Sequence, residues 1–139
     1  PPGLGLSAVQ VGIARRIVVA RAPDTPTQSD PDAAPRTLMM ANPEIVWASD
    51  ETALMEEGCL SLPDQYADLE RPAEVTVRYL DRGGEQVETK ATGVLARCLQ
   101  HELDHLDGVL LVDRLSPVRR NIILRKLAKA KKFKQSDAA

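Results

Sequence analysis

The stretch Gln100-His101-Glu102-Leu103-Asp104-His105 carries the residues best suited to chemistry. In a helix, His101 and His105 lie four residues apart and project from one face, so that two ring nitrogens can reach one metal ion. Glu102 lies on nearly the same side, where its carboxylate can accept a proton from a water molecule. Both histidines of the chain belong to this motif. The alternative is a surface helix with two solvated histidines, because short motifs also match by chance.

A catalytic site of this kind uses three protein ligands and leaves one position for water. The chain has no third histidine, and the segment after His105 offers only Asp107 and Asp113 before the basic C-terminal region. Cys59 is therefore the strongest candidate for the third ligand, as a thiolate held in an irregular segment. A small buried hydrophobic residue is the alternative interpretation of Cys59. A thiolate with two imidazoles suits zinc, iron(II), nickel or cobalt.

The motif must be positioned by a helix that the sequence predicts at residues 94–106, ended by Gly108. One stripe of this helix is apolar and should be buried: Leu95, Leu99, Leu103 and Leu106. The neighbouring stripe carries the two ligands, with Val94 and Cys98 on the preceding turns. We expect Cys98 to be a packing residue rather than a ligand. The metal-binding face therefore borders the buried face of the same helix.

Extended segments are expected before this helix. Strands are predicted there at residues 13–21, 38–42, 45–47, 73–80 and 85–92, and a further short strand is predicted after the helix, at residues 109–112. Pro43 should mark an edge or the end of a strand. The proline-rich residues 22–37 should form a surface loop. A second helix is predicted from Pro117 to about residue 133, with Val118, Ile122 and Leu127 buried, together with Ile123 and Ala130.

The length of 139 residues predicts a single domain spanning residues 1–139. The net charge of −2 argues against a protein that coats nucleic acid, and no apolar run is long enough to cross a membrane.

Two cysteines do not form a disulfide framework, so a reducing compartment is expected. The chain begins with proline, so a further upstream segment, including a processed targeting peptide, is an open alternative.

The C-terminal region is strongly basic. Residues 116–139 contain eight lysines and arginines and one acidic residue, Asp137. A solvated helix face is the ordinary interpretation of such a run. The excess of positive charge is larger than that interpretation requires, so an anionic partner is an open alternative.

Three separated segments together resemble the peptide deformylase family, which removes the formyl group from nascent polypeptides that begin with N-formylmethionine. They are Gly3-Leu4-Gly5-Leu6-Ser7-Ala8-Val9-Gln10, Glu57-Gly58-Cys59-Leu60-Ser61 and the histidine motif, in that order. Three such segments are far more specific than one metal motif, whereas the glycine pair alone is weak evidence. Family members normally carry a further segment, including a helix, before the glycine motif, where this chain begins. Ser7 lies where the family often has alanine.

The resemblance implies an α+β fold, with antiparallel β-sheets packed around the central helix that carries the histidine motif and with the C-terminal helix outside. It implies that Cys59, His101 and His105 bind one divalent metal ion. Fe²⁺ is the expected ion, and Zn²⁺, Ni²⁺ or Co²⁺ would replace it. An iron–thiolate site would also be sensitive to oxygen, because the thiolate can be oxidised.

The resemblance also assigns roles to residues around the metal. Glu102 would be the general base, and the oxyanion would be met by the Gln10 side-chain amide and the backbone N–H of Leu60. Glu57 and Arg71 would form an ion pair that fixes the Cys59 segment. Asp104 would support a histidine, or else be a solvated carboxylate. Substrate-binding positions are expected at Gly3, Leu4, Gly5, Leu6, Gly58, Val94 and Cys98.

The implied substrate is a formylated nascent peptide, whose backbone would pair with residues 3–6 as an added strand. The ribosome is a further expected partner, through the basic C-terminal helix. Neither DNA nor a membrane is expected as a partner. A monomer in a bacterial-type cytoplasm is expected, with an organelle as the alternative location. Two rival functions stay open: a peptidase or other amidase that uses the same metal, and a catalytically impaired homologue that binds peptide or the ribosome.

Overall fold

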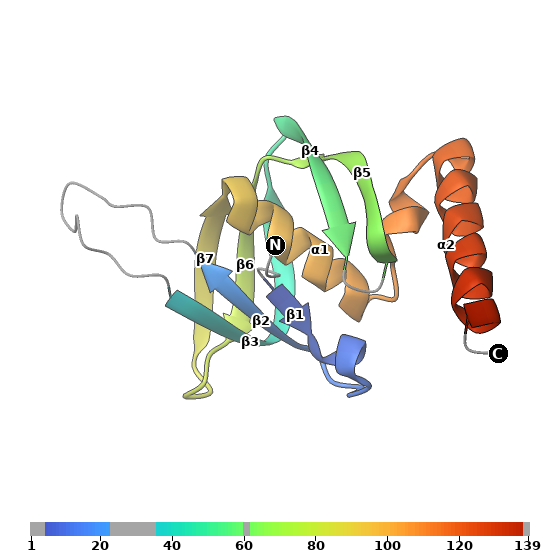
Figure 1. Cartoon of the computed structure of the whole chain (residues 1–139). Coiled ribbons are helices and arrows are strands. Elements are labelled where there is room, and N and C mark those ends of the chain that lie inside the picture. Colours follow the sequence, from blue (N-terminus) through green and yellow to red (C-terminus); the bar gives the residue numbers. More distant parts are fainter. Residues whose placement is uncertain (1–4, 23–35, 60–61, 138–139) are drawn as a thin grey trace. The chain divides into compact units, whose positions relative to one another are not determined.

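The computed structural model describes residues 5–22, 36–59 and 62–137 (Figure 1). Its strands are β1 (Gly5–Ser7), β2 (Ile17–Ala22), β3 (Arg36–Ala48), β4 (Thr52–Cys59), β5 (Leu62–Pro72), β6 (Glu74–Leu80) and β7 (Gln86–Thr92). Its helices are α1 (Gly93–Leu106) and α2 (Pro117–Asp137), with 3-10 helices η1 (Ala8–Val11) and η2 (Leu111–Arg114). Most of the predicted surface loop, residues 23–35, lies outside the described residues.

Five of the strands form one antiparallel sheet in the order β1-β2-β3-β6-β7. The alternating pattern of β6 has the predicted effect, because Val75, Val77 and Tyr79 are buried on one face. β6 and β7 form the predicted hairpin, with Leu80 opposite Gln86. Strand β1 lies at one edge of the sheet and pairs only with β2 among the described strands.

Pro43 does not end a strand, which corrects the sequence prediction. It lies inside β3, where the pairing with β6 shifts register between Ala41 and Glu44. Asn42 adopts a positive φ of 51° at this bulge. A bulge leaves one residue outside the ladder, so a proline without an N–H donor is accommodated there.

Helix α1 packs against β1, β2, β6 and β7 (Figure 1). Leu99 and Leu103 are buried, and Leu95 and Leu106 pack against the same core as half-buried residues, which confirms the predicted stripe. Gly108 has a φ of 75° and its N–H donates to the His105 carbonyl, so it ends the helix as expected. The sheet and this helix thus hold the histidine motif on a well-packed element.

The chain divides into two compact units. One comprises Pro1–Leu54 and Glu70–Gly108, and contains the sheet and α1. The other comprises Met55–Leu69 and Val109–Ala139, and its core contains Ala67, Val112 and Ile123. Strands β4 and β5 pair as a two-stranded sheet. The sequence did not predict these two strands.

Two sequence predictions fail in the second unit. Residues 109–112 do not form a strand, because Leu111–Arg114 is a 3-10 helix whose Asp113 carboxylate accepts the Leu110 N–H at 2.9 Å. Helix α2 buries Ile123 and half-buries Leu127, whereas Val118, Ile122 and Ala130 are exposed.

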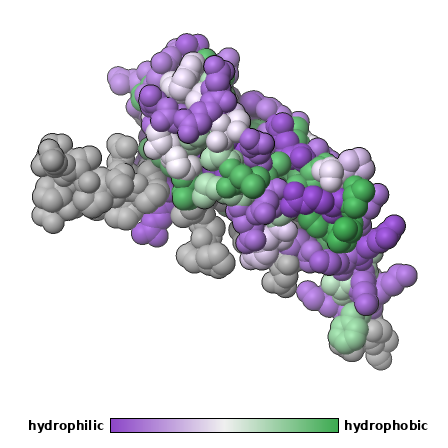
Figure 2. Space-filling model, turned by 90° about the horizontal axis from the view of Figure 1, so that it is seen from above, coloured by the Kyte–Doolittle hydropathy of each residue, from purple (hydrophilic) through white to green (hydrophobic). Residues whose placement is uncertain are grey.

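Apolar side chains remain at the surface among hydrophilic ones over the face shown in Figure 2. On α2 the exposed ones include Val118 and Phe133, 70% and 68% exposed. Among the described residues, no helix is long and apolar enough to span a membrane. The α+β class with antiparallel pairing and two α-helices is as predicted.

Candidate metal centre

The two histidines of α1 face each other through their ring nitrogens. The Nε2 atoms of His101 and His105 are 3.1 Å apart, and their rings meet edge to face at an interplanar angle of 73°. Two nitrogens that each lie about 2.0–2.1 Å from one tetrahedral ion are roughly 3.3 Å apart, so this spacing is that of two ligands sharing a metal. His105 is buried and His101 half-buried. The helical spacing therefore places two imidazole ligands side by side on one face of α1, as the sequence predicted.

Cys59 completes a three-ligand group. Its Sγ atom and one nitrogen of each histidine all lie within 4.8 Å of one another. The cysteine is the last residue of β4, not part of an irregular segment as the sequence suggested, and it is half-buried. One thiolate and two imidazoles are the donors that a borderline-soft divalent ion prefers, and three ligands leave a position for a fourth.

The two competing carboxylates are engaged elsewhere. Asp107 pairs with Arg16, whose guanidinium nitrogen lies 2.9 Å from the carboxylate and also donates to the Leu106 carbonyl at 3.5 Å. Asp113 caps η2 and lies 3.9 Å from Arg120. Neither belongs to the metal-ligating group found among the described residues. Cys59 is thus the third ligand that the structure supports.

Glu102 is buried, at 4% exposure, and lies on α1 next to the first histidine. The face of the helix that carries it is approached closely by strand β1. A Cβ atom added at Gly5 would lie 2.7 Å from the Cys98 sulfur and 3.1 Å from the Glu102 Cγ. Only glycine allows this approach without displacing one of those side chains.

The other predicted site residues fall at several places. Gln10 is half-buried in η1, and its Oε1 accepts the Ser7 N–H at 2.9 Å. Leu6 is 38% exposed, Val94 is 44% exposed, and Cys98 is half-buried. Gly3, Leu4 and Leu60 lie outside the described residues.

Around Cys59, strand β4 buries Glu57 at 6% exposure and leaves Gly58 exposed. A Cβ atom at Gly58 would lie 2.5 Å from the ring of Tyr66 on β5, so this glycine allows the ring to lie against the strand. A contact of Gly58 with substrate stays a prediction, as does the ion pair of Glu57 with Arg71.

Asp104 has a partner that the sequence did not reveal. The Arg71 guanidinium lies 2.8 Å from its carboxylate, and the two side chains are only 6% and 14% exposed. Asp104 is therefore an ion-paired carboxylate rather than a solvated one. The pair links β5 to the helix one residue before His105. Thirty-three residues separate the partners, and no local pattern signals such a contact.

Gln100 and Arg97 also support helix α1, a role that the sequence did not predict. The buried Gln100 amide donates to the carbonyls of Pro72 and Ala96, at 2.9 and 3.1 Å. Arg97 donates to the Ala53 carbonyl. A signal was present in the sequence, since two polar side chains fall beside the apolar stripe of α1. Both fix the rotation of the helix that presents the histidines.

Replacing Arg71 by methionine is expected to lower the free energy of unfolding by about 3–5 kcal/mol, because it leaves the Asp104 charge buried without this partner. Arg78→Met is the matched control. Its pair with Glu88 is 43% and 51% exposed, and loss of such a pair changes stability by about 0–1 kcal/mol. Urea unfolding of both variants measures the difference. Equal losses would show that the Arg71 pair has no special structural role.

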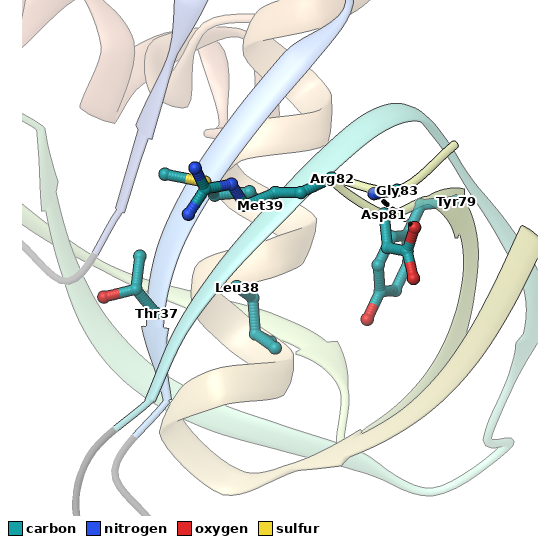
Figure 3. A pocket seen from close by; sticks show the side chains of 7 residues that line it. All are labelled: Thr37, Leu38, Met39, Tyr79, Asp81, Arg82 and Gly83. Atoms are coloured by element: carbon teal, nitrogen blue, oxygen red, sulfur yellow. Dashed lines mark hydrogen bonds between the residues drawn. The ribbon is translucent and has the colours of Figure 1, made fainter. Parts of the chain in front are cut away.

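A separate pocket of about 280 Å³ lies at the start of β3 and the β6–β7 turn (Figure 3). Leu38, Tyr79 and Arg82 are among its lining residues. Asp81 bonds locally, accepting the Gly83 N–H at 2.9 Å. The pocket lining includes none of the predicted site residues, so this pocket is separate from the substrate-binding positions that the sequence predicted.

Comparisons with known proteins agree with this geometry. Residues 2–121 match the family model described as polypeptide deformylase. A peptide deformylase of Rhizobium meliloti is 43% identical over 99% of this chain and 75% of its own length.

Two solved structures are similar to the chain. A crystal structure of peptide deformylase from Ehrlichia chaffeensis has a TM-score of 0.83 and 39% identity, covering 96% of this chain and 76% of that one. A Met-Ala-Ser-bound peptide deformylase from Acinetobacter baumannii has a TM-score of 0.70 and 44% identity, covering 81% and 70%. With a ligand group of one cysteine and two histidines in place, the chain belongs to the polypeptide deformylase family.

Proposed function

We propose that this deformylase hydrolyses the formamide bond of formyl-methionyl peptides with Glu102 as general base and Gln10 and Leu60 as oxyanion donors. The observation that carries the proposal is the convergence of Cys59, His101 and His105 within 4.8 Å in a chain of this family. A metal held there would supply activation of water and polarisation of the formyl oxygen. We propose Fe²⁺ as the native ion, with Zn²⁺, Ni²⁺ or Co²⁺ as replacements, because the donor set suits all four.

The protein groups then divide the proton and charge transfers. The Glu102 carboxylate would accept the proton of the attacking water and deliver it to the leaving amine nitrogen. Its burial and its place beside His101 support this role. The Gln10 amide nitrogen and the Leu60 N–H would donate hydrogen bonds to the oxygen that becomes negatively charged in the transition state.

The peptide would bind by adding a strand to the edge of the sheet at β1. The sheet topology supports strand addition at this edge, since β1 pairs only with β2 among the described strands. Backbone groups there can form a ladder with an extended peptide. Gly3, Leu4, Gly5 and Gly58 would contribute backbone or close approach. Leu4, Leu6, Val94 and Cys98 would line the apolar site for the methionine side chain.

The experiment that tests the proposal is an assay of the metal-loaded protein with formyl-Met-Ala-Ser, in which free amine is measured. The tripeptide is chosen because the Acinetobacter baumannii relative was crystallised with Met-Ala-Ser bound. We expect the formyl group to be removed and Met-Ala-Ser to be released, and we expect the peptide bonds within Met-Ala-Ser to stay intact. Cleavage inside the peptide would favour the rival peptidase. Bound metal without turnover would favour the impaired homologue that binds peptide or the ribosome.

We also propose that the ribosome is a partner, through α2. The helix carries all eight basic residues of the C-terminal region, which suits an RNA surface. Binding should weaken as salt rises and after removal of residues 117–139. Salt-insensitive binding, or binding that survives the truncation, would contradict this partner.

The remaining assignments follow from the relatives. The deformylases that match include those of the bacteria Rhizobium meliloti and Ehrlichia chaffeensis, and we propose a bacterial-type cytoplasmic location, where nascent chains emerge. We further propose that residues 1–139 act as one catalytic domain and as a monomer. Gel filtration of the metal-loaded protein tests the monomer.

A further inference from the structure

Ser7 places a buried hydroxyl beside the proposed oxyanion donor. It is the last residue of β1, and its side chain is 0% exposed. Residues alternate between the faces of a strand, so Ser7 shares a face with Gly5, which approaches α1. The next residue begins η1, which carries Gln10. The strand and the short helix therefore bring Ser7 and Gln10 together within one turn.

Two donors of Ser7 converge on one atom of Gln10. The Ser7 backbone N–H donates to Gln10 Oε1 at 2.9 Å, and the Ser7 hydroxyl lies 3.1 Å from the same oxygen. A backbone N–H can only donate, so the atom facing it must be the amide oxygen, which fixes the orientation of the side-chain amide. A carbonyl oxygen has two lone pairs and accepts both bonds. Because Oε1 faces Ser7, the amide nitrogen Nε2 is directed away from Ser7.

We infer that the Ser7 hydroxyl is a positioning group for deformylation, which holds the Gln10 amide so that Nε2 is directed at the reacting carbonyl. One hydrogen bond from the backbone leaves the amide able to pivot about that bond. A second bond from the hydroxyl restricts this rotation. Donors that are already oriented stabilise developing charge without reorganising during the reaction. The role rests on the proposed function of Gln10 as an oxyanion donor.

The test is a double-mutant cycle between Ser7→Ala and Gln10→Ala, measured with formyl-Met-Ala-Ser. Gln10→Ala should lower kcat by about 10²–10³-fold, as expected for one oxyanion donor. Ser7→Ala should lower kcat by about 3- to 10-fold with KM nearly unchanged, because the oriented amide acts on charge that develops only in the transition state. In the Gln10→Ala background, Ser7→Ala should have no further effect on kcat.

Two controls separate positioning from packing. Ser7→Cys keeps the site filled, with a sulfur somewhat larger than the oxygen, but the thiol is a weak donor, so kcat should fall nearly as far as in Ser7→Ala. Ser49→Ala removes a half-buried hydroxyl that donates to the Glu51 carbonyl at 2.8 Å and accepts the Glu74 N–H at 3.0 Å, and it should leave kcat unchanged. The side-chain NH₂ signals of ¹⁵N-labelled Gln10 should also broaden in Ser7→Ala, independently of activity.

The outcomes distinguish this inference from the proposed function. An active wild type whose kcat falls by the same factor on Ser7→Ala in both backgrounds would show a merely structural serine and overturn the inference. So would an active Ser7→Ala variant with wild-type kcat. A metal-loaded wild type without turnover would instead overturn the proposed function, and the positioning role with it.

Discussion

Glu102→Gln is expected to lower kcat for formyl-Met-Ala-Ser by about 10²–10⁴-fold while metal content stays at the wild-type level. The side chain is buried on α1, and glutamine has nearly the same size and shape, so packing should be retained. Its neutral amide cannot take up the proton of the attacking water. The carboxylate is not one of the three grouped ligand atoms, so metal binding should not depend on it.

Steady-state release of free amine and elemental analysis of the purified variant measure the two expectations separately. Glu74→Gln is the matched control, because this carboxylate is 41% exposed on β6 and lies 3.6 Å from the Lys90 amine. It should leave both kcat and metal content unchanged. If Glu102→Gln retained wild-type kcat, another group would have to act as the base. If it lost the metal, Glu102 would be a ligand or a support for one.

The part of the site that the sequence predicted best is the part with strong local periodicity. The leucine stripe at spacings of four, four and three specified both helix α1 and its buried face, and the histidine spacing then placed two ligands on the neighbouring face. Cys59 was found by elimination, since no third histidine exists. Its setting was not found, because the residues around it follow no clear period that would signal strand β4.

The sequence predictions were wrong or incomplete in two situations. In one, the local pattern of residues was weak; in the other, the structure depends on contacts between residues far apart in the chain. A four-residue apolar run at 109–112 is compatible with several structures, and the cap from Asp113 to the Leu110 N–H accompanies a 3-10 helix. On α2, apolar residues occur on more than one face, so periodicity did not show that Ile123 would be buried and Ile122 exposed. The Arg71–Asp104 pair joins residues far apart in sequence and became visible only with the fold.

Cys59→Ala is expected to abolish both turnover and stable metal binding, because it removes one of the three grouped ligands. The metal provides a readout independent of activity. An ion that binds only the folded protein stabilises it by mass action, so a chelator should lower the Tm of the wild type but not of Cys59→Ala. Cys98→Ala is the matched control, as this half-buried cysteine packs against the core of α1 and the sheet, and it should keep the chelator-sensitive Tm.

Cys59→Asp then distinguishes a required ligand from a required thiolate. Aspartate can still offer an anionic oxygen, but it is a harder ligand than sulfur. A deformylase should therefore lose most of its turnover in this variant even where some metal is retained. A peptidase-type site with a downstream carboxylate ligand would be indifferent to both changes at Cys59. Full metal content and wild-type turnover in Cys59→Ala would contradict the assigned centre. The carboxylates of Asp107 and Asp113 would then have to leave Arg16 and the Leu110 N–H to supply the third ligand.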